Sequence, residues 1–82
     1  MITEKDMINA WVHWKKVGLM PPDVKDIKEF KASVRTMYTH FKNTNLSVFQ
    51  AAVLIAGKGH YRWPTILDVE LAIEAQERIE NG

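Results

Sequence analysis

The segment KGHYRWP, residues 58–64, gathers the side chains best suited to binding. Tyrosine and tryptophan offer large amphipathic rings at low entropy cost, and an arginine between them could contact a carboxylate or phosphate through two hydrogen bonds. Protein interfaces favour these three residue types. We therefore predict a partner-binding loop formed by Lys58, His60, Tyr61 and Arg62. In the alternative interpretation Trp63 and Pro64 close the core, and only the charged side chains and His60 face water.

A second group of basic residues lies on the predicted helix over residues 24–41 and just after it. Lys28, Lys31, Arg35 and Lys42 fall on a face beside the apolar one. Such a face could follow a phosphate backbone by releasing counterions, or it could simply be solvated. Lys31 and Arg35 are therefore added to the candidate partner-binding residues.

The residues that could support catalysis are not arranged for it. His13, His40 and His60 form no pair four residues apart, and without cysteine a zinc site is not expected. Ser33 and Ser47 do not lie in a nucleophile-elbow pattern, and the glycines match no phosphate-binding loop. We expect no catalytic, metal-binding or cofactor-binding site, and hence no enzyme.

Composition indicates one globular domain spanning residues 1–82, with 46% apolar and 26% charged residues. The net charge of +1 is unevenly spread. Residues 15–62 carry nine basic and three acidic side chains, whereas residues 65–82 carry five acidic side chains and one arginine. This asymmetry could bind an acidic surface or nucleic acid, or the two parts could attract each other within the fold. The sequence has neither an export-signal pattern nor a long apolar run, so we expect a cytoplasmic protein without membrane insertion.

The first predicted helix spans residues 4–17, with Thr3 as N-cap, Asp6 completing a capping box and Gly18 ending it. Its apolar stripe follows helical spacing and comprises Met7, Ala10, Trp11, Trp14 and Val17. Ile8 and Val12 lie off this stripe. The tryptophans are expected in the core, but together with Ile8 and Val12 they could form a homodimer seam or a docking site.

The second helix is predicted over residues 24–41, after the break at Pro21 and Pro22, with Asp23 as N-cap. Its predicted core face comprises Ile27, Phe30, Val34, Met37, Tyr38 and Phe41. The third helix, residues 46–56 with Thr44 or Asn45 as N-cap, is apolar nearly all round and is therefore expected to be central and most buried. A strand over residues 52–55 is the competing interpretation, but alanines and Gln50 favour helix.

The last helix is predicted to run to residue 79, capped by Thr65 together with Asp68. Its predicted core face is formed by Val69, Ala72, Ala75 and Ile79, with Glu70, Glu74 and Glu77 pointing outward. The predicted fold class is therefore all-α, a compact four-helix domain with a central apolar third helix.

Residues 23–72 resemble the small helical domain of phage replicative-helicase loaders and inhibitors. The resemblance rests on an earlier helix with Phe49, Ala52 and Leu54, followed by a motif formed by Trp63, Pro64, Thr65, Asp68 and Val69. The loop between them is longer and more basic than the family pattern. The resemblance implies a phage or prophage origin, a role in DNA replication, and a helicase or its loader as partner.

We therefore expect a non-enzymatic adaptor or regulator that binds a larger protein. One alternative is a small nucleic-acid-binding regulator that uses the basic second helix and the loop over residues 58–64. Another is a phage regulator of a different target, such as the lysis or transcription machinery. Salt dependence separates the first two, because phosphate contacts weaken steeply as salt rises.

Overall fold

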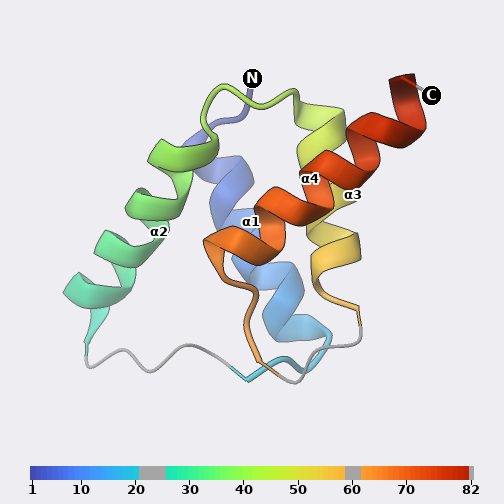
Figure 1. Cartoon of the computed structure of the whole chain (residues 1–82). Helices are drawn as coiled ribbons and strands as arrows, with labels where there is room; N and C mark the ends of the chain where they lie inside the picture. The colour runs from blue at the N-terminus through green and yellow to red at the C-terminus, as the bar shows by residue number, and fades with distance from the viewer. Residues whose placement is uncertain (21–25, 59–61, 82) are drawn as a thin grey trace.

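The protein is an all-α bundle of four helices in the described residues, 1–20, 26–58 and 62–81 of a computed structural model. The helices are α1 (Glu4–Lys16), α2 (Ile27–Phe41), α3 (Leu46–Ala56) and α4 (Ile66–Asn81). Figure 1 shows α1 behind α4, with α2 on one side and α3 on the other. The start of α1 and the end of α4 lie at the same end of the bundle (Figure 1). No helix within the described ranges is both long enough and apolar enough to cross a membrane.

The ends of α1 are set by the predicted capping residues. The Thr3 hydroxyl accepts from the Asp6 backbone N–H, and the Asp6 carboxylate accepts from the Thr3 N–H at 2.7 Å. At the other end Gly18 has a positive φ of 87°. Its N–H donates to Lys15 O, while the next N–H, of Leu19, donates to Trp14 O. This pair of bonds is a Schellman motif, which confirms the predicted stop.

The start of α2 differs from the prediction. The N-cap is Asp26, whose carboxylate accepts from the Glu29 N–H at 2.8 Å, so the helix begins at Ile27 rather than at residue 24. Asp23 lies outside the described residues. The prediction named only Asp23, but the aspartate three residues later has the same capping chemistry. Ile27 is the first residue of the helix and is 72% exposed, so its predicted place in the core is wrong.

The last two helices begin as predicted. The Asn45 side chain accepts from the N–H groups of Ser47 and Val48 at the start of α3, and residues 52–55 are helical. At the start of α4 the Thr65 hydroxyl accepts from the Asp68 N–H, and Asp68 accepts from the Thr65 N–H in return. Local capping chemistry therefore fixes both helix starts.

The core is centred on the aromatic residues. Trp14 is completely buried, and its indole Nε1–H donates to Val53 O of α3 at 3.0 Å. Trp63, 8% exposed, contacts both Trp11 and Trp14 edge to face at centroid distances of 5.5 and 5.7 Å. Phe30 of α2 contacts Trp11 in the same way at 5.2 Å. The aromatic rings thus join α1, α2 and the segment before α4.

Burial departs from the predicted core faces at several positions. Three side chains predicted in the core are exposed: Val17, Ala75 and Ile79. Val17 follows the last residue of α1, and the buried stripe of α4 is rotated relative to the predicted core face. That stripe includes Ile73, which the prediction missed. The third helix is not buried on all sides either. Its buried residues face α1 and α4, while three large side chains are between 37% and 51% exposed: Leu46, Leu54 and Ile55.

The predicted homodimer seam loses its two largest members. Trp11 and Trp14 are 5% and 0% exposed, so both belong to the core and neither is available to a second chain. Ile8 and Val12 remain on the surface, 48% and 46% exposed. These two side chains are neighbours one turn apart on α1, and a small exposed aliphatic pair of this kind is common on protein surfaces.

Candidate functional site

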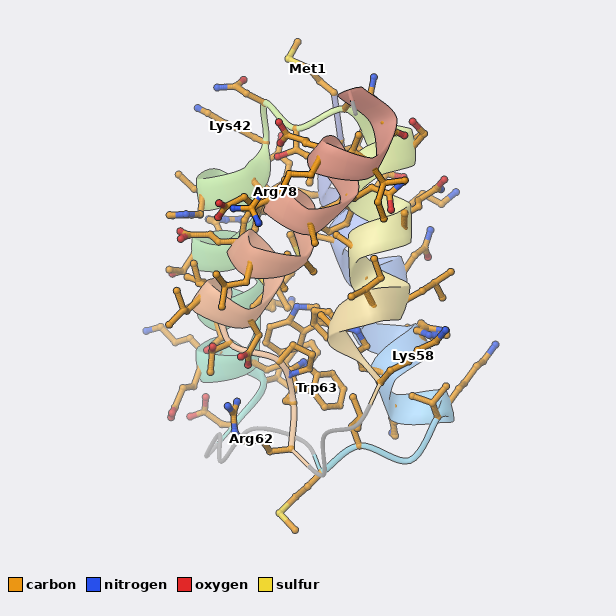
Figure 2. The ribbon with its side chains drawn as sticks, turned by 45° about the vertical axis from the view of Figure 1, so that its right-hand side comes forward. Met1, Lys42, Lys58, Arg62, Trp63 and Arg78 are labelled. Carbon is orange, nitrogen blue, oxygen red and sulfur yellow. The ribbon has the colours of Figure 1, made fainter. Side chains whose placement is uncertain are left out.

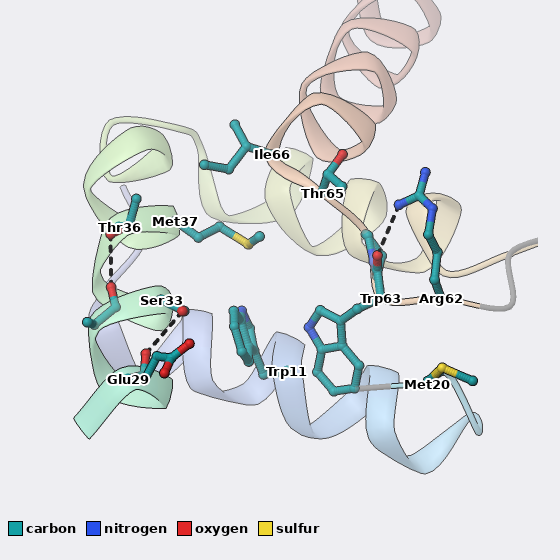
Figure 3. A pocket seen from close by; sticks show the side chains of 12 residues that line it. Trp11, Met20, Glu29, Ser33, Thr36, Met37, Arg62, Trp63, Thr65 and Ile66 are labelled. Carbon is teal, nitrogen blue, oxygen red and sulfur yellow. Dashed lines mark hydrogen bonds between the residues drawn. The ribbon is translucent and has the colours of Figure 1, made fainter. Parts of the chain in front are cut away.

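An apolar groove of about 550 Å³ lies between α2 and the segment that leads into α4 (Figure 3). Trp11 and Trp63 form its floor, and Met37 and Ile66 lie on the side away from them. This volume falls within the range typical of binding pockets, about 300–1,000 Å³. The remaining lining residues are Met20, Glu29, Ala32, Ser33, Thr36, Arg62, Pro64 and Thr65.

The segment before α4 is positioned by a short backbone contact. Met20 and Arg62 form an isolated parallel β-bridge, in which the Trp63 N–H donates to Met20 O at 3.1 Å. This bridge holds residues from before α2 and before α4 side by side. Consequently Trp63 enters the core and Arg62 stays at the rim, with its side chain 58% exposed.

The two floor tryptophans carry unpaired polar atoms. Nε1 of Trp11 and Nε1 of Trp63 are both buried, and neither has a hydrogen-bond acceptor among the described residues. Figure 3 shows the Trp63 indole nitrogen on the ring edge that faces Trp11. A buried donor without an acceptor costs about 1–3 kcal/mol, so native proteins rarely leave one without a reason. Both atoms are covered by neighbouring side chains, so they lie beneath the surface of the groove and do not face into it.

The hydroxyl groups along the α2 side of the groove are already used as donors. Ser33 Oγ donates to Glu29 O at 3.0 Å, and Thr36 Oγ1 donates to Ala32 O at 2.9 Å (Figure 3). Both bonds stay within the helix, as is common for serine and threonine at interior positions. These short side chains leave space in front of the tryptophans.

Arg62 is fixed at one end of the groove. Its Nη1 donates to Trp63 O at 3.2 Å and to Asp68 Oδ2 at 3.0 Å. Hydrogen bonds to the Asp68 carboxylate, first from the Thr65 backbone N–H and then from the Thr65 hydroxyl and Arg62, hold the pKa of Asp68 below its ordinary value of 3.8, against the opposing effect of burial. Asp68 therefore stays ionised at neutral pH and keeps the guanidinium in place.

One turn beyond the groove, α2 and α4 are in direct contact. His40 Nε2 of α2 meets Glu70 Oε1 of α4, and Ile73 is buried nearby. The two elements are therefore tied together at one end, whereas the space between Ala32 and Thr65 remains open.

The structure divides the predicted partner-binding residues between surfaces. Arg62 lines the groove, but Lys58 is exposed and points to the opposite side of the molecule (Figure 2). His60 and Tyr61 lie outside the described residues. Trp63 belongs to the core, as the alternative interpretation of the loop proposed.

Lys31 and Arg35 lie on a different face of α2 from the groove. Both are exposed, and Arg35 Nε is 3.7 Å from Glu4 Oε1. The groove residues of α2 occur at positions 29, 32, 33, 36 and 37, whereas the basic residues occur at 28, 31, 35 and 42. At 100° per residue the centres of these two sets are more than a quarter turn apart.

Sequence reasoning missed Ala32, Ser33 and Thr36. Their shared signal is small size at spacings of three and four residues beside an apolar face, which leaves a gap wherever a neighbouring element does not fill it. That signal is visible in the sequence, but the element on the other side of the gap is not. Comparison of the chain with protein-family models, curated proteins and solved structures finds no match.

Proposed function

We propose that the protein is a non-enzymatic adaptor or regulator that binds a segment of a larger protein in the groove between α2 and the start of α4. One observation carries the proposal: the groove is apolar, about 550 Å³ in volume, and has Trp11 and Trp63 on its floor. Binding of a partner's apolar side chain would remove this apolar lining from water.

The groove suits a protein segment in its dimensions and composition. Its floor and far side are aromatic and aliphatic, and its rim carries polar groups from Glu29, Thr65 and Arg62. Tryptophan and arginine are the residue types that dominate interface energies, and an apolar centre with a polar rim is the usual organisation of an interface. Anchoring by one or two side chains is the expected mode.

For the partner's identity, the support is the sequence resemblance to phage replicative-helicase loaders and inhibitors. We propose a phage-derived regulator of DNA replication, acting in the cytoplasm on a replicative helicase or its loader. Another phage or host target, such as the lysis or transcription machinery, fits the same groove and is the alternative.

The rival proposal is a small nucleic-acid-binding regulator. Its support is the exposed basic face of α2, with Lys28, Lys31, Arg35 and Lys42. Two observations weigh against it. Arg35 is partly neutralised by Glu4, and α4 adds an acidic surface to the same small molecule.

The test uses two substitutions at neighbouring residues of α2. Ala32→Trp places a large ring in the groove from an exposed position, while Lys31→Trp places the same ring on the basic face. Affinity capture from nuclease-treated native cells with wild type and both variants shows which face matters. We expect one protein that is lost with Ala32→Trp and retained with Lys31→Trp.

Loss of the captured protein with Lys31→Trp but not with Ala32→Trp would exclude the adaptor proposal. Recovery of nucleic acid and no protein from cells that were not treated with nuclease would exclude it as well. Titration of a labelled DNA duplex at low salt is the complementary measurement. Tight binding that falls steeply with salt, and that Lys31→Trp weakens more than Ala32→Trp, would establish the rival.

A further inference from the structure

The outer face of α1 combines lysines with exposed aliphatic side chains. Lysines precede and follow the exposed pair Ile8 and Val12 along the helix. At 100° per residue these exposed residues fall within an arc of about 100°, which lies apart from the buried stripe of the helix. The residues of this arc are Lys5, Ile8, Val12, Lys15 and Lys16.

The basic face of α2 continues this surface. Arg35 Nε lies 3.7 Å from Glu4 Oε1, so the exposed basic side chains of α2 adjoin the start of α1. The other acidic side chains of these segments serve elsewhere, since Asp6 and Asp26 cap the two helices and Glu29 lines the groove. The two helices therefore share one basic surface, formed by Lys5, Lys15, Lys16, Lys28, Lys31, Arg35 and Lys42.

The lysines of the basic surface are not neutralised within the described part of the chain. None of them forms an ion pair with another described residue, and Arg35 alone has an acidic partner there. Figure 1 shows α4, which carries most of the glutamates, in front of α1, on the side away from the outer face of that helix. The uneven charge of the sequence thus becomes a separation of charge across the bundle, and the basic surface attracts anions.

We infer that the basic surface binds the face of a membrane that contains anionic lipids, without crossing it. Lysine near such a membrane strengthens binding by roughly a factor of five per side chain. The aliphatic pair favours lipid over nucleic acid, because Ile8 and Val12 can enter the headgroup region, whereas a phosphate backbone offers no apolar contact. The inference goes beyond the proposed function, since the groove lies on a different face of α2.

The experiment measures co-sedimentation of the protein with lipid vesicles. One set of vesicles contains phosphatidylcholine and phosphatidylserine, and the other contains phosphatidylcholine alone. Wild type should bind the anionic vesicles at least about tenfold more tightly than the neutral ones, and this binding should weaken as salt rises. Equal affinity for both sets, or binding to neither, would overturn the inference.

Matched charge reversals test whether the basic surface is the binding surface. Lys31→Glu should weaken binding to anionic vesicles by about tenfold or more. Arg78→Glu changes the net charge by the same amount on α4, and it should leave binding within about twofold. Equal losses in the two variants would overturn the inference, because net charge rather than this surface would then determine binding.

A second matched pair tests the aliphatic side chains. Val12→Ser should weaken binding to anionic vesicles by about threefold, whereas Leu71→Ser, at an exposed position of α4, should not change it. Urea denaturation of each variant verifies that it is folded. Unchanged binding of Val12→Ser would overturn the role of lipid.

Two further measurements separate the inference from the proposals above. Ala32→Trp, which fills the groove, should bind anionic vesicles as wild type does, and loss of binding in this variant would overturn the assignment to the basic surface. A labelled DNA duplex at the same phosphate concentration is the competing ligand. Tighter binding to the duplex than to the vesicles, lost in Lys31→Glu and unchanged in Val12→Ser, would replace lipid by nucleic acid.

Discussion

Trp14 and Trp11 lie one turn apart on α1, yet their surroundings differ. On the α3 side, Trp14 is fully buried and its indole N–H donates to Val53 O. On the α2 side, Trp11 and Trp63 are almost as buried, but their indole N–H groups lack acceptors and border a groove. The difference teaches that burial alone does not identify a structural side chain. Whether its polar atoms are paired separates the closed half of the cluster from the open half, which borders the groove.

The largest expected effect comes from breaking the closed side. Trp14→Ala should lower the free energy of unfolding by about 3–5 kcal/mol, because it removes a fully buried aromatic ring and leaves a cavity between α1 and α3. Urea denaturation followed by circular dichroism measures the change. The control is Val12→Ala on the same helix, where a 46% exposed side chain should cost less than about 1 kcal/mol.

A sharper comparison replaces tryptophan by phenylalanine, which removes the indole N–H donor and keeps an aromatic ring. Trp14→Phe and Trp11→Phe both shorten a buried ring, but only the first breaks a hydrogen bond. We expect Trp14→Phe to be the more destabilising by about 1 kcal/mol, the net contribution of a typical hydrogen bond. If Trp11→Phe cost as much or more in the same denaturation experiment, the proposed contrast between the two halves would be wrong.

Lowering the pH should weaken the hydrogen bonds that the Asp68 carboxylate accepts at the rim of the groove. The pKa of Asp68 is lowered in the folded state, so its contribution to stability is present above the ordinary value of 3.8 and is lost as pH falls through the lowered pKa. Asp68→Asn should therefore cost about 1 kcal/mol at pH 7, as the loss of a capping interaction does, and much less in strong acid. Urea titrations of wild type and variant at neutral and low pH measure both values; an unchanged difference would contradict the assignment.

The smallest effect is expected on the basic face of α2, away from both halves. Arg35 and Glu4 are 3.7 Å apart and largely exposed, so Arg35→Ala should change stability by no more than about 0.5 kcal/mol. It should also leave unchanged the protein recovered by affinity capture, because Arg35 does not line the groove. Loss of that protein would move the binding site to the basic face.

Local chemistry explains what the sequence predicted well. Thr3, Asp6, Gly18, Asn45 and Thr65 set helix ends through hydrogen bonds to residues a few positions away. The error at α2 is of the same local kind, because the sequence predicted Asp23 as N-cap and the Asp26 carboxylate caps the helix.

The groove depends on contacts between distant residues, and for that reason it was not predicted. The bridge between Met20 and Arg62 brings Trp63 to the ring of Trp11, which no local pattern specifies. The predicted loop residues therefore separate, with Arg62 at the groove and Lys58 pointing away from it. Hydrophobic periodicity placed both tryptophans of α1 in the core but could not tell which one would be paired.

The indole region of a ¹H–¹⁵N correlation spectrum tests the central claim most directly, because the chain has three tryptophans and hence three indole N–H signals. Trp→Phe variants assign them. The Trp14 signal should depend least on temperature because its N–H is bonded to Val53 O, whereas the Trp11 and Trp63 signals, whose N–H groups lack acceptors, should depend on temperature more strongly. A Trp11 or Trp63 signal with as small a temperature dependence as that of Trp14 would contradict the difference between the closed half of the aromatic cluster and the half that borders the groove.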